Sequence, residues 1–165
     1  MAIPVGTSDY KREICEKYFN MIYKLALAST RDVHIAEDVT SDVFLKYMES
    51  KKVFESEEHI KAWLLRVTIN ASRSVFSSSW FKKTVALDET LEAAGIPEEE
   101  SDVYLAVMNL PEKYRTVIHL FYYEDYSVLE IADILNSKES TVKSQLLRAR
   151  ALLKESLKGA TGLVF

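Results

Sequence analysis

A cluster of hydroxyl, amide and basic side chains near the C-terminal end has the residue types and spacing to contact nucleic acid. These residues occupy outward positions of an expected helix over 140–157: Ser140, Thr141, Lys143, Ser144, Gln145 and Arg148. Hydroxyls and amides form hydrogen bonds with base edges, and cations neutralise phosphates. The spacing alone equally allows the solvated face of an ordinary helical hairpin, so at this stage the cluster is a candidate DNA surface.

A second cluster mixes aromatic, basic and amide side chains in residues 51–73. Its members are Phe54, Lys61, Trp63, Arg66, Asn70 and Arg73. Stacking, hydrogen bonds to exposed base edges and phosphate neutralisation together hold single-stranded nucleic acid. Phe54 and Trp63 also suit a hydrophobic core, and that alternative stays open. Three nearby acids, Glu55, Glu57 and Glu58, repel phosphate unless they point away from it or read an exocyclic amine.

A third cluster is acidic and lies on the expected helix over 34–49. Glu37 with Ser41 and Asp38 with Asp42 are pairs four residues apart, so they share one outward face. An acidic strip suits a basic protein surface and does not suit DNA. In isolation, a merely solvated face is the favoured explanation of this strip.

The elements that must position these clusters are helices, because the apolar residues recur at helical spacing. Amphipathic helices are expected over 10–29, 34–49 and 57–76, which is enough for a small bundle. Met48 is expected on the inward side of the second helix. The inward residues expected in the third are Ile60, Trp63, Leu64, Val67 and Ala71.

Four more helices are expected after residue 101, over 102–109, 112–124, 128–135 and 140–157. Ser127 followed by Glu130 predicts a capping box at the start of the third of these. A turn at 136–138 then gives a short helix, a tight turn and a longer helix, the spacing of a helix-turn-helix. Tyr122 and Leu152 are expected to face inward.

Composition separates these two groups of helices. Net charge is −4, and residues 86–102 carry seven acids and no base, so that all of the excess acidity is local. Glycine, proline and the run Glu98–Glu100 in this segment disfavour a continuing helix. The fold predicted is all-α: a bundle module at 8–80, an acidic linker at 81–101 and a helix-turn-helix module at 102–158. A short helix at 87–94 inside one continuous domain is the alternative.

The sequence also disfavours several classes of protein. No run of 18 apolar residues predicts a membrane span, and the N-terminus lacks the pattern of a signal peptide. The single cysteine, Cys15, indicates a reducing cytoplasm. The three histidines lack metal-ligand spacing, and no phosphate loop or nucleophile motif is present. No metal, cofactor or enzymatic activity is expected.

The amino-acid sequences of four segments resemble those of bacterial sigma factors of the sigma-70 family, in the extracytoplasmic-function (ECF) branch. STVKSQLLRARALLKESL resembles the recognition helix of region 4, and NLPEKYRTVIHLFYYEDYSVLEIADIL resembles the segment before it. IAEDVTSDVFLKYM resembles region 2.2, and VFESEEHIKAWLLRVTIN resembles regions 2.3 and 2.4. The four segments occur in the family's order and span most of residues 20–157.

The resemblance implies a promoter-specificity subunit of RNA polymerase. The recognition-helix residues Ser140, Thr141, Lys143, Ser144, Gln145 and Arg148 would read the −35 element. The second cluster would read and open the −10 element, with a flipped base in the loop over 54–59. The β′ clamp helices of core polymerase would bind Glu37, Asp38, Ser41, Asp42 and Leu45. The β flap and an anti-sigma protein are further partners that the resemblance allows.

The chain departs from the family pattern at several positions. Ser41 replaces a usual glutamine, and Ser74, Ser77 and Ser78 replace an aspartate and two arginines. Gln145 replaces an arginine, which favours adenine over guanine by edge geometry. Two alternatives therefore stay open: a sigma-like decoy or anti-sigma-binding protein, and a free-standing helix-turn-helix regulator.

Overall fold

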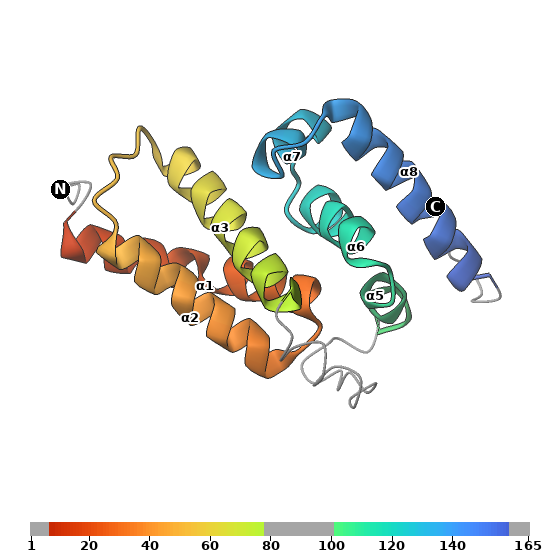
Figure 1. Ribbon diagram of the computed structural model, residues 1–165, viewed down its shortest axis with the longest axis horizontal. Helices are drawn as coiled ribbons and strands as arrows, with labels where there is room; N and C mark the ends of the chain where they lie inside the picture. The colour runs from red at the N-terminus through yellow and green to blue at the C-terminus, as the bar shows by residue number, and fades with distance from the viewer. Residues whose placement is uncertain (1–6, 78–100, 159–165) are drawn as a thin grey trace. The chain divides into compact units, whose positions relative to one another are not determined.

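The computed structural model describes residues 7–77 and 101–158, and in these ranges it contains helices and no strand. The chain divides into two compact units, Met1–Leu87 and Asp88–Phe165. The all-α fold is therefore confirmed (Figure 1). The expected acidic linker at 81–101 lies almost wholly outside the described residues, so its boundaries stay a prediction.

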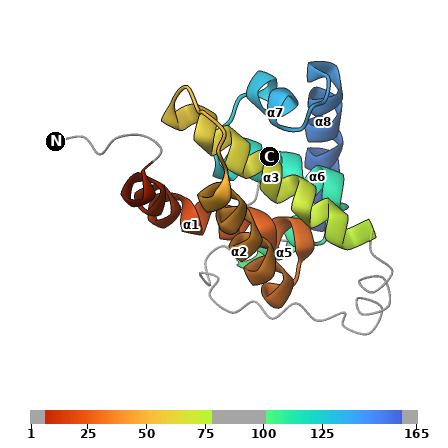
Figure 2. The ribbon, with the colours of Figure 1, turned by 60° about the vertical axis from the view of Figure 1, so that its left-hand side comes forward.

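The first unit is a bundle of three helices, α1 (Ser8–Thr30), α2 (Val33–Glu49) and α3 (Glu57–Ser77). All three pack against one another, as Figures 1 and 2 show. A two-residue turn joins α1 to α2: Arg31 adopts the left-handed conformation, and the Asp32 carboxylate caps α2 by accepting from the Ile35 backbone N–H at 3.0 Å. These bounds agree with the expected helices within about two residues.

The inward face of α3 differs from the one expected. Leu65, Thr68, Ile69 and Ser72 are buried with Ile60 and Leu64, whereas Trp63, Val67 and Ala71 are only half-buried. The reason is that the hydroxyls of Thr68 and Ser72 donate to carbonyls four residues earlier, at 2.7 and 2.8 Å. Small polar residues whose hydroxyls are hydrogen-bonded in this way can be buried in a core. A pattern of apolar residues alone does not predict their burial.

A lysine of α1 binds the C-terminal end of α2. The Lys11 ammonium donates to the backbone oxygens of Tyr47, Met48 and Ser50, at 3.3, 3.2 and 2.6 Å. Carbonyls in the last turn of a helix lack partners within the helix, so a cation placed there satisfies and stabilises them. Tyr47 takes the core position at this end, and Met48 is exposed, contrary to expectation.

The second unit contains α5 (Ser101–Met108), α6 (Glu112–Ile118), the π-helix η2 (His119–Tyr123), α7 (Val128–Ile134) and α8 (Glu139–Ser156). The turn from α5 to α6 is held by Arg115, a buried side chain that donates to the backbone oxygens of Met108 and Leu110 at 3.3 and 2.8 Å. Arg115 therefore has a structural role in this turn.

The helix expected over 112–124 widens at His119. The Glu124 N–H bonds to the His119 oxygen at 3.2 Å, the five-residue spacing of a π-helix. The extra residue rotates the following side chains away from the core, so Tyr122 and Tyr123 are 48% and 44% exposed. The expectation that Tyr122 faces inward is wrong for this reason.

The helix-turn-helix itself forms as expected. The capping box is present, with Ser127 and Glu130 exchanging hydrogen bonds at 3.1 Å at the start of α7. Asn136 takes the left-handed conformation in the turn before α8, which asparagine tolerates. The buried stripe of α8 is Val142, Leu146, Ala149 and Leu153, and Leu152, expected inward, is 41% exposed.

Within the described residues, none of the helices combines the length and the apolar composition that a membrane span requires. In the same ranges, no three His, Cys, Asp or Glu side chains gather into a group that could hold a metal ion. Cys15 is half-buried, and burial raises the pKa of its thiol, which disfavours the reactive thiolate.

Candidate nucleic-acid interface

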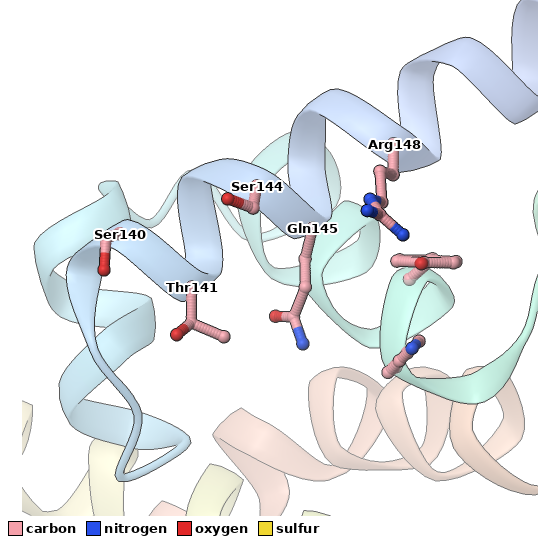
Figure 3. Close-up of a pocket in the computed structure, with 7 residues that line it drawn as sticks. Ser140, Thr141, Ser144, Gln145 and Arg148 are labelled. Carbon is pink, nitrogen blue, oxygen red and sulfur yellow. The ribbon is translucent and has the colours of Figure 1, made fainter.

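The predicted recognition surface lies on one side of α8. Ser140, Thr141, Lys143, Ser144 and Arg148 are exposed, and Gln145 is half-buried. Figure 3 shows the labelled side chains following one another along the helix. Because the buried stripe of α8 holds the opposite side against the unit's core, these polar groups present hydroxyls, an amide and a guanidinium to solvent.

This surface borders an open groove of about 350 Å³ that α6 helps to form. The groove is lined by Lys113 and Tyr114 of α6 together with Ser140, Thr141, Ser144, Gln145 and Arg148 of α8 (Figure 3). No carboxylate lines it, so its charge comes from Lys113 and Arg148. Sequence reasoning missed Lys113 and Tyr114, because only the packing of α6 beside α8 brings them to the recognition surface.

Lys143 differs from the other predicted residues of α8, because it is absent from the groove lining. Its ammonium lies 3.3 Å from the carboxylate of Glu139, one turn earlier. Both side chains are exposed, and such pairs contribute little to stability. Lys143 therefore remains available to a stronger anion.

In the first unit, Phe54 and Trp63 form one aromatic cluster with Tyr47. The Phe54 and Trp63 ring centroids are 5.6 Å apart in an edge-to-face arrangement, and each lies about 6 Å from the Tyr47 ring. Tyr47 is buried, while Phe54 and Trp63 are half-buried. Phe54 and Trp63 are thus neither fully buried nor fully exposed: part of each ring packs in the cluster and part stays open to solvent.

The acidic residues of this loop do not act alike. Glu57 points toward α1, where its carboxylate accepts from the Lys17 ammonium at 2.5 Å and from the Tyr18 hydroxyl at 2.9 Å. These hydrogen bonds lower the pKa of Glu57. Its charge is therefore neutralised by Lys17, and only Glu55 and Glu58 remain exposed near the candidate −10 loop.

The polar residues that were predicted on α3 divide into two groups. Arg66, Asn70 and Arg73 are exposed and recur at intervals of four and three residues, so they form one outward strip. Lys61 is half-buried and, at five residues before Arg66, falls on a different side of the helix. The structure therefore brings together three of the four predicted polar residues and separates Lys61 from them.

The acidic cluster of α2 is on the surface as expected. Glu37, Asp38, Ser41 and Asp42 are exposed, and Leu45 beside them is 55% exposed. An apolar side chain of this exposure next to carboxylates makes a mixed surface, suited to a protein partner with basic and apolar groups.

Two helical units, the second with a helix-turn-helix whose outward face is polar and basic, define a class of DNA-binding protein. Comparison with known protein families narrows that class. The family model "Sigma-70 region 2" matches residues 14–81, and "Sigma-70, region 4" matches residues 100–153.

Individual relatives agree with these matches. The ECF RNA polymerase sigma factor SigW of Bacillus subtilis is 31% identical over 171 aligned residues, covering 93% of this chain and 91% of SigW. SigM of the same organism is 30% identical, covering 86% of this chain and 91% of SigM. The chain therefore belongs to the ECF sigma factors of the sigma-70 family, which are transcription initiation factors.

Solved structures support the fold. The sigma factor RpoE of Bartonella quintana, solved with the anti-sigma factor NepR, superimposes with a TM-score of 0.75 at 23% identity, covering 92% of this chain and 98% of RpoE. CnrH, solved with the cytosolic domain of CnrY, gives a TM-score of 0.67 at 22% identity, covering 95% of this chain and 92% of CnrH. At these identities the likeness concerns the fold alone.

Proposed function

We propose that this sigma factor binds core RNA polymerase and directs it to a two-part promoter, with α8 reading the −35 element. The observation that carries the −35 assignment is the outward face of α8 and its groove, which offer hydroxyls, an amide and two cations with no carboxylate in the lining. These are the groups that bind base edges and phosphates in a major groove.

For the −10 element we propose the loop before α3 and the outward strip of that helix. Phe54 and Trp63, anchored on Tyr47, would flank an unstacked base, and Arg66, Asn70 and Arg73 would follow the strand. Lys61 would contact the strand from a different side of α3. The loss of one repelling charge through the Glu57–Lys17 pair supports this use of the loop.

For core polymerase we propose the surface of α2 formed by Glu37, Asp38, Ser41, Asp42 and Leu45. Its carboxylates would face basic groups of the β′ clamp helices, and the second unit would contact the β flap. The chain would supply no catalysis, since RNA synthesis belongs to the polymerase. A chain that acts with core polymerase would be located in the bacterial cytoplasm. It would be associated with the nucleoid when the polymerase is bound to DNA.

The experiment that tests this function is transcription in vitro with purified core polymerase and a promoter library, with and without the chain. We expect transcripts that start at a fixed distance from a shared two-part motif. Charge reversal of the α2 surface, by Asp38→Lys with Asp42→Lys, should abolish both core binding and these transcripts. A matched reversal on α1, Glu13→Lys with Glu16→Lys, should leave both intact.

A second candidate is a sigma-like decoy or anti-sigma-binding protein. Ser74, Ser77 and Ser78, which stand where the family has an aspartate and two arginines, favour it by removing charges near the upstream duplex. Binding of core polymerase without any promoter-dependent transcript would support the decoy. DNA binding without core binding would instead support a free-standing helix-turn-helix regulator.

A further inference from the structure

Two cations meet at the α6 side of the groove beside α8. Lys113 comes from α6 and Arg148 from α8, and both belong to the groove lining. Among the described residues, no ion pair links either of them to a carboxylate. Grouped like charges repel unless an anion lies between or beside them. The free protein therefore holds a positive site whose natural complement is an anion.

One residue, Tyr114, holds both cations. The Lys113 ammonium lies 5.0 Å from the centroid of the Tyr114 ring, a cation–π distance. Interaction with the Arg148 guanidinium lowers the pKa of the Tyr114 hydroxyl, and the nearby Lys113 charge acts in the same direction. Tyr114 is itself 8% exposed, so its ring is fixed by the packing of the unit.

Along the same groove lie groups suited to the bases. The Gln145 oxygen Oε1 is buried and has no hydrogen-bond partner among the described residues. Once the side chain turns this oxygen toward the groove that Gln145 lines, it accepts from a donor such as the exocyclic amine of adenine or cytosine. Thr141 and Ser144 line the groove on either side of it in sequence. The groove thus has a cationic part near α6 and a neutral polar part on α8.

We propose that the cationic part of the groove binds one backbone phosphate of the −35 duplex. Lys113 and Arg148 neutralise the phosphate, and Tyr114 is the positioning residue that holds them together. Such a contact carries no sequence information, but it sets the register in which Gln145 meets the bases. The inference rests on the proposed −35 function of α8, and it assigns to α6 a part in DNA binding.

The test uses polymerase holoenzyme assembled with the full chain and a promoter duplex recovered in the transcription assay. Single phosphates around the −35 element are replaced in turn by uncharged methylphosphonate. We expect one substitution to weaken binding of the parent chain roughly tenfold, as loss of a charged hydrogen bond does. Lys113→Ala and Arg148→Ala should bind more weakly and be insensitive at that same position.

Two further variants separate positioning from folding. Tyr114→Phe keeps the buried ring and loses the hydroxyl, so we expect weaker binding, reduced sensitivity at the same phosphate and an unchanged base preference at −35. Lys154→Ala removes an exposed charge of α8 outside the groove lining and should keep the parent's pattern.

The possible outcomes distinguish the phosphate site from the function on which it rests. If Lys113→Ala and Arg148→Ala remain as sensitive as the parent at every phosphate, the site is wrong although the −35 function stands. If the parent chain yields no promoter-dependent transcript, the proposed function itself fails.

Discussion

Gln145 is the residue of α8 that most distinguishes this chain from the family pattern. Its carboxamide has both a donor and an acceptor, and the acceptor oxygen is buried without a partner in the described structure. A carboxamide matches the donor and acceptor pair on the major-groove edge of adenine, whereas a guanidinium matches guanine. The −35 sequence should therefore depend on this side chain.

Gln145→Arg should change the preferred −35 base from adenine to guanine at one position. A good bidentate pair discriminates by about 1–3 kcal/mol, or roughly 5- to 150-fold between the two bases. Transcription from a library randomised at −35 measures the preference. Leu152→Ala, on the same helix but outside the groove lining, is the control. An unchanged preference at every position would remove Gln145 from base reading.

Glu57 is a second single residue with a testable effect, because its negative charge contributes to the stability of the first unit. Its carboxylate joins α3 to α1 through Lys17 and Tyr18, and its pKa is lowered mainly by the hydrogen bond from Lys17. A carboxylate whose pKa is lower in the folded chain than in the unfolded chain stabilises the fold above the unfolded value. That stabilisation is lost as the pH falls through the folded value.

Glu57→Gln should lower the melting temperature of the first unit at pH 7 by roughly 1–4 °C, the range for an exposed ion pair in a domain of this size. The difference from the parent should disappear in acid, below the folded pKa of Glu57. Melting curves of the full chain across this pH range measure it. Glu58→Gln, next in sequence and exposed, should show no such pH-dependent difference.

At the scale of elements, contacts between helices hold the functional segments in place. The Lys11 ammonium closes the last turn of α2 at the point where the chain enters the loop that carries Phe54. Without the ammonium, the oxygens of Met48 and Ser50 lose this donor, and the Tyr47 oxygen keeps the Ser50 N–H at 3.2 Å. The start of the loop is then held less firmly. The stability of this helix end and the geometry of the loop are therefore linked.

Lys11→Met keeps most of the aliphatic length and removes the ammonium. We expect the first unit to lose about 1 kcal/mol of stability, as for removal of a cation at a helix C-terminus. Hydrogen exchange should accelerate at the end of α2 and in residues 50–56. Lys24→Met, an exposed lysine in the middle part of α1, serves as the control. Unaltered exchange in that loop would contradict the link.

In the second unit, Arg150 of α8 contacts η2. The Arg150 Nε donates to the Tyr122 hydroxyl at 2.7 Å, and its guanidinium lies 5.5 Å from the Phe121 ring centroid and 5.7 Å from that of Tyr122. The π-helix makes this contact possible, because its extra residue brings Tyr122 to the surface beside α8.

Tyr122→Phe should cost the second unit about 1 kcal/mol, the usual net contribution of a hydrogen bond, while the ring contact remains. Urea denaturation of the full chain measures the loss. Because Tyr122 does not line the groove, the −35 preference should stay as in the parent. Arg150→Met and the double variant complete a thermodynamic cycle, and strictly additive losses would show that the Arg150 contact is not the cause.

At the scale of the whole molecule, the two units are joined by the segment with the highest acidity. Residues 86–102 hold seven carboxylates and no base. In a basic channel of the polymerase, such a run would compete with nucleic acid for the same cations. This hypothesis rests on charge alone.

Replacing Glu98–Glu100 by glutamine should therefore change the yield of initiated transcripts without changing the start site. The measurement is the ratio of short to full-length transcripts on one promoter. Glu13→Gln with Glu16→Gln, two exposed acids of α1, provides a matched loss of charge. An unaltered ratio in the linker variant would refute the hypothesis.

Residue patterns along the chain were enough to predict the positions of the helices, the helix-turn-helix and the family. The Ser127 capping box and the turn at 136–138 are local signals, and both form as expected. Apolar spacing predicted where the helices lie but misplaced the inward face of α3. The outward polar faces of α2 and α8 follow from the same periodicity, because a helix with one buried stripe exposes the opposite one.

Features that depend on packing between distant segments could not be predicted from the sequence and are seen only in the folded chain. The tertiary structure turned Glu57 toward Lys17, admitted Thr68 and Ser72 to the core, and widened the helix at His119 so that Tyr122 reached the surface. It also brought Lys113 and Tyr114 to the groove beside α8. Residue spacing predicts neighbours only within one element, whereas these contacts arise when separate helices pack together.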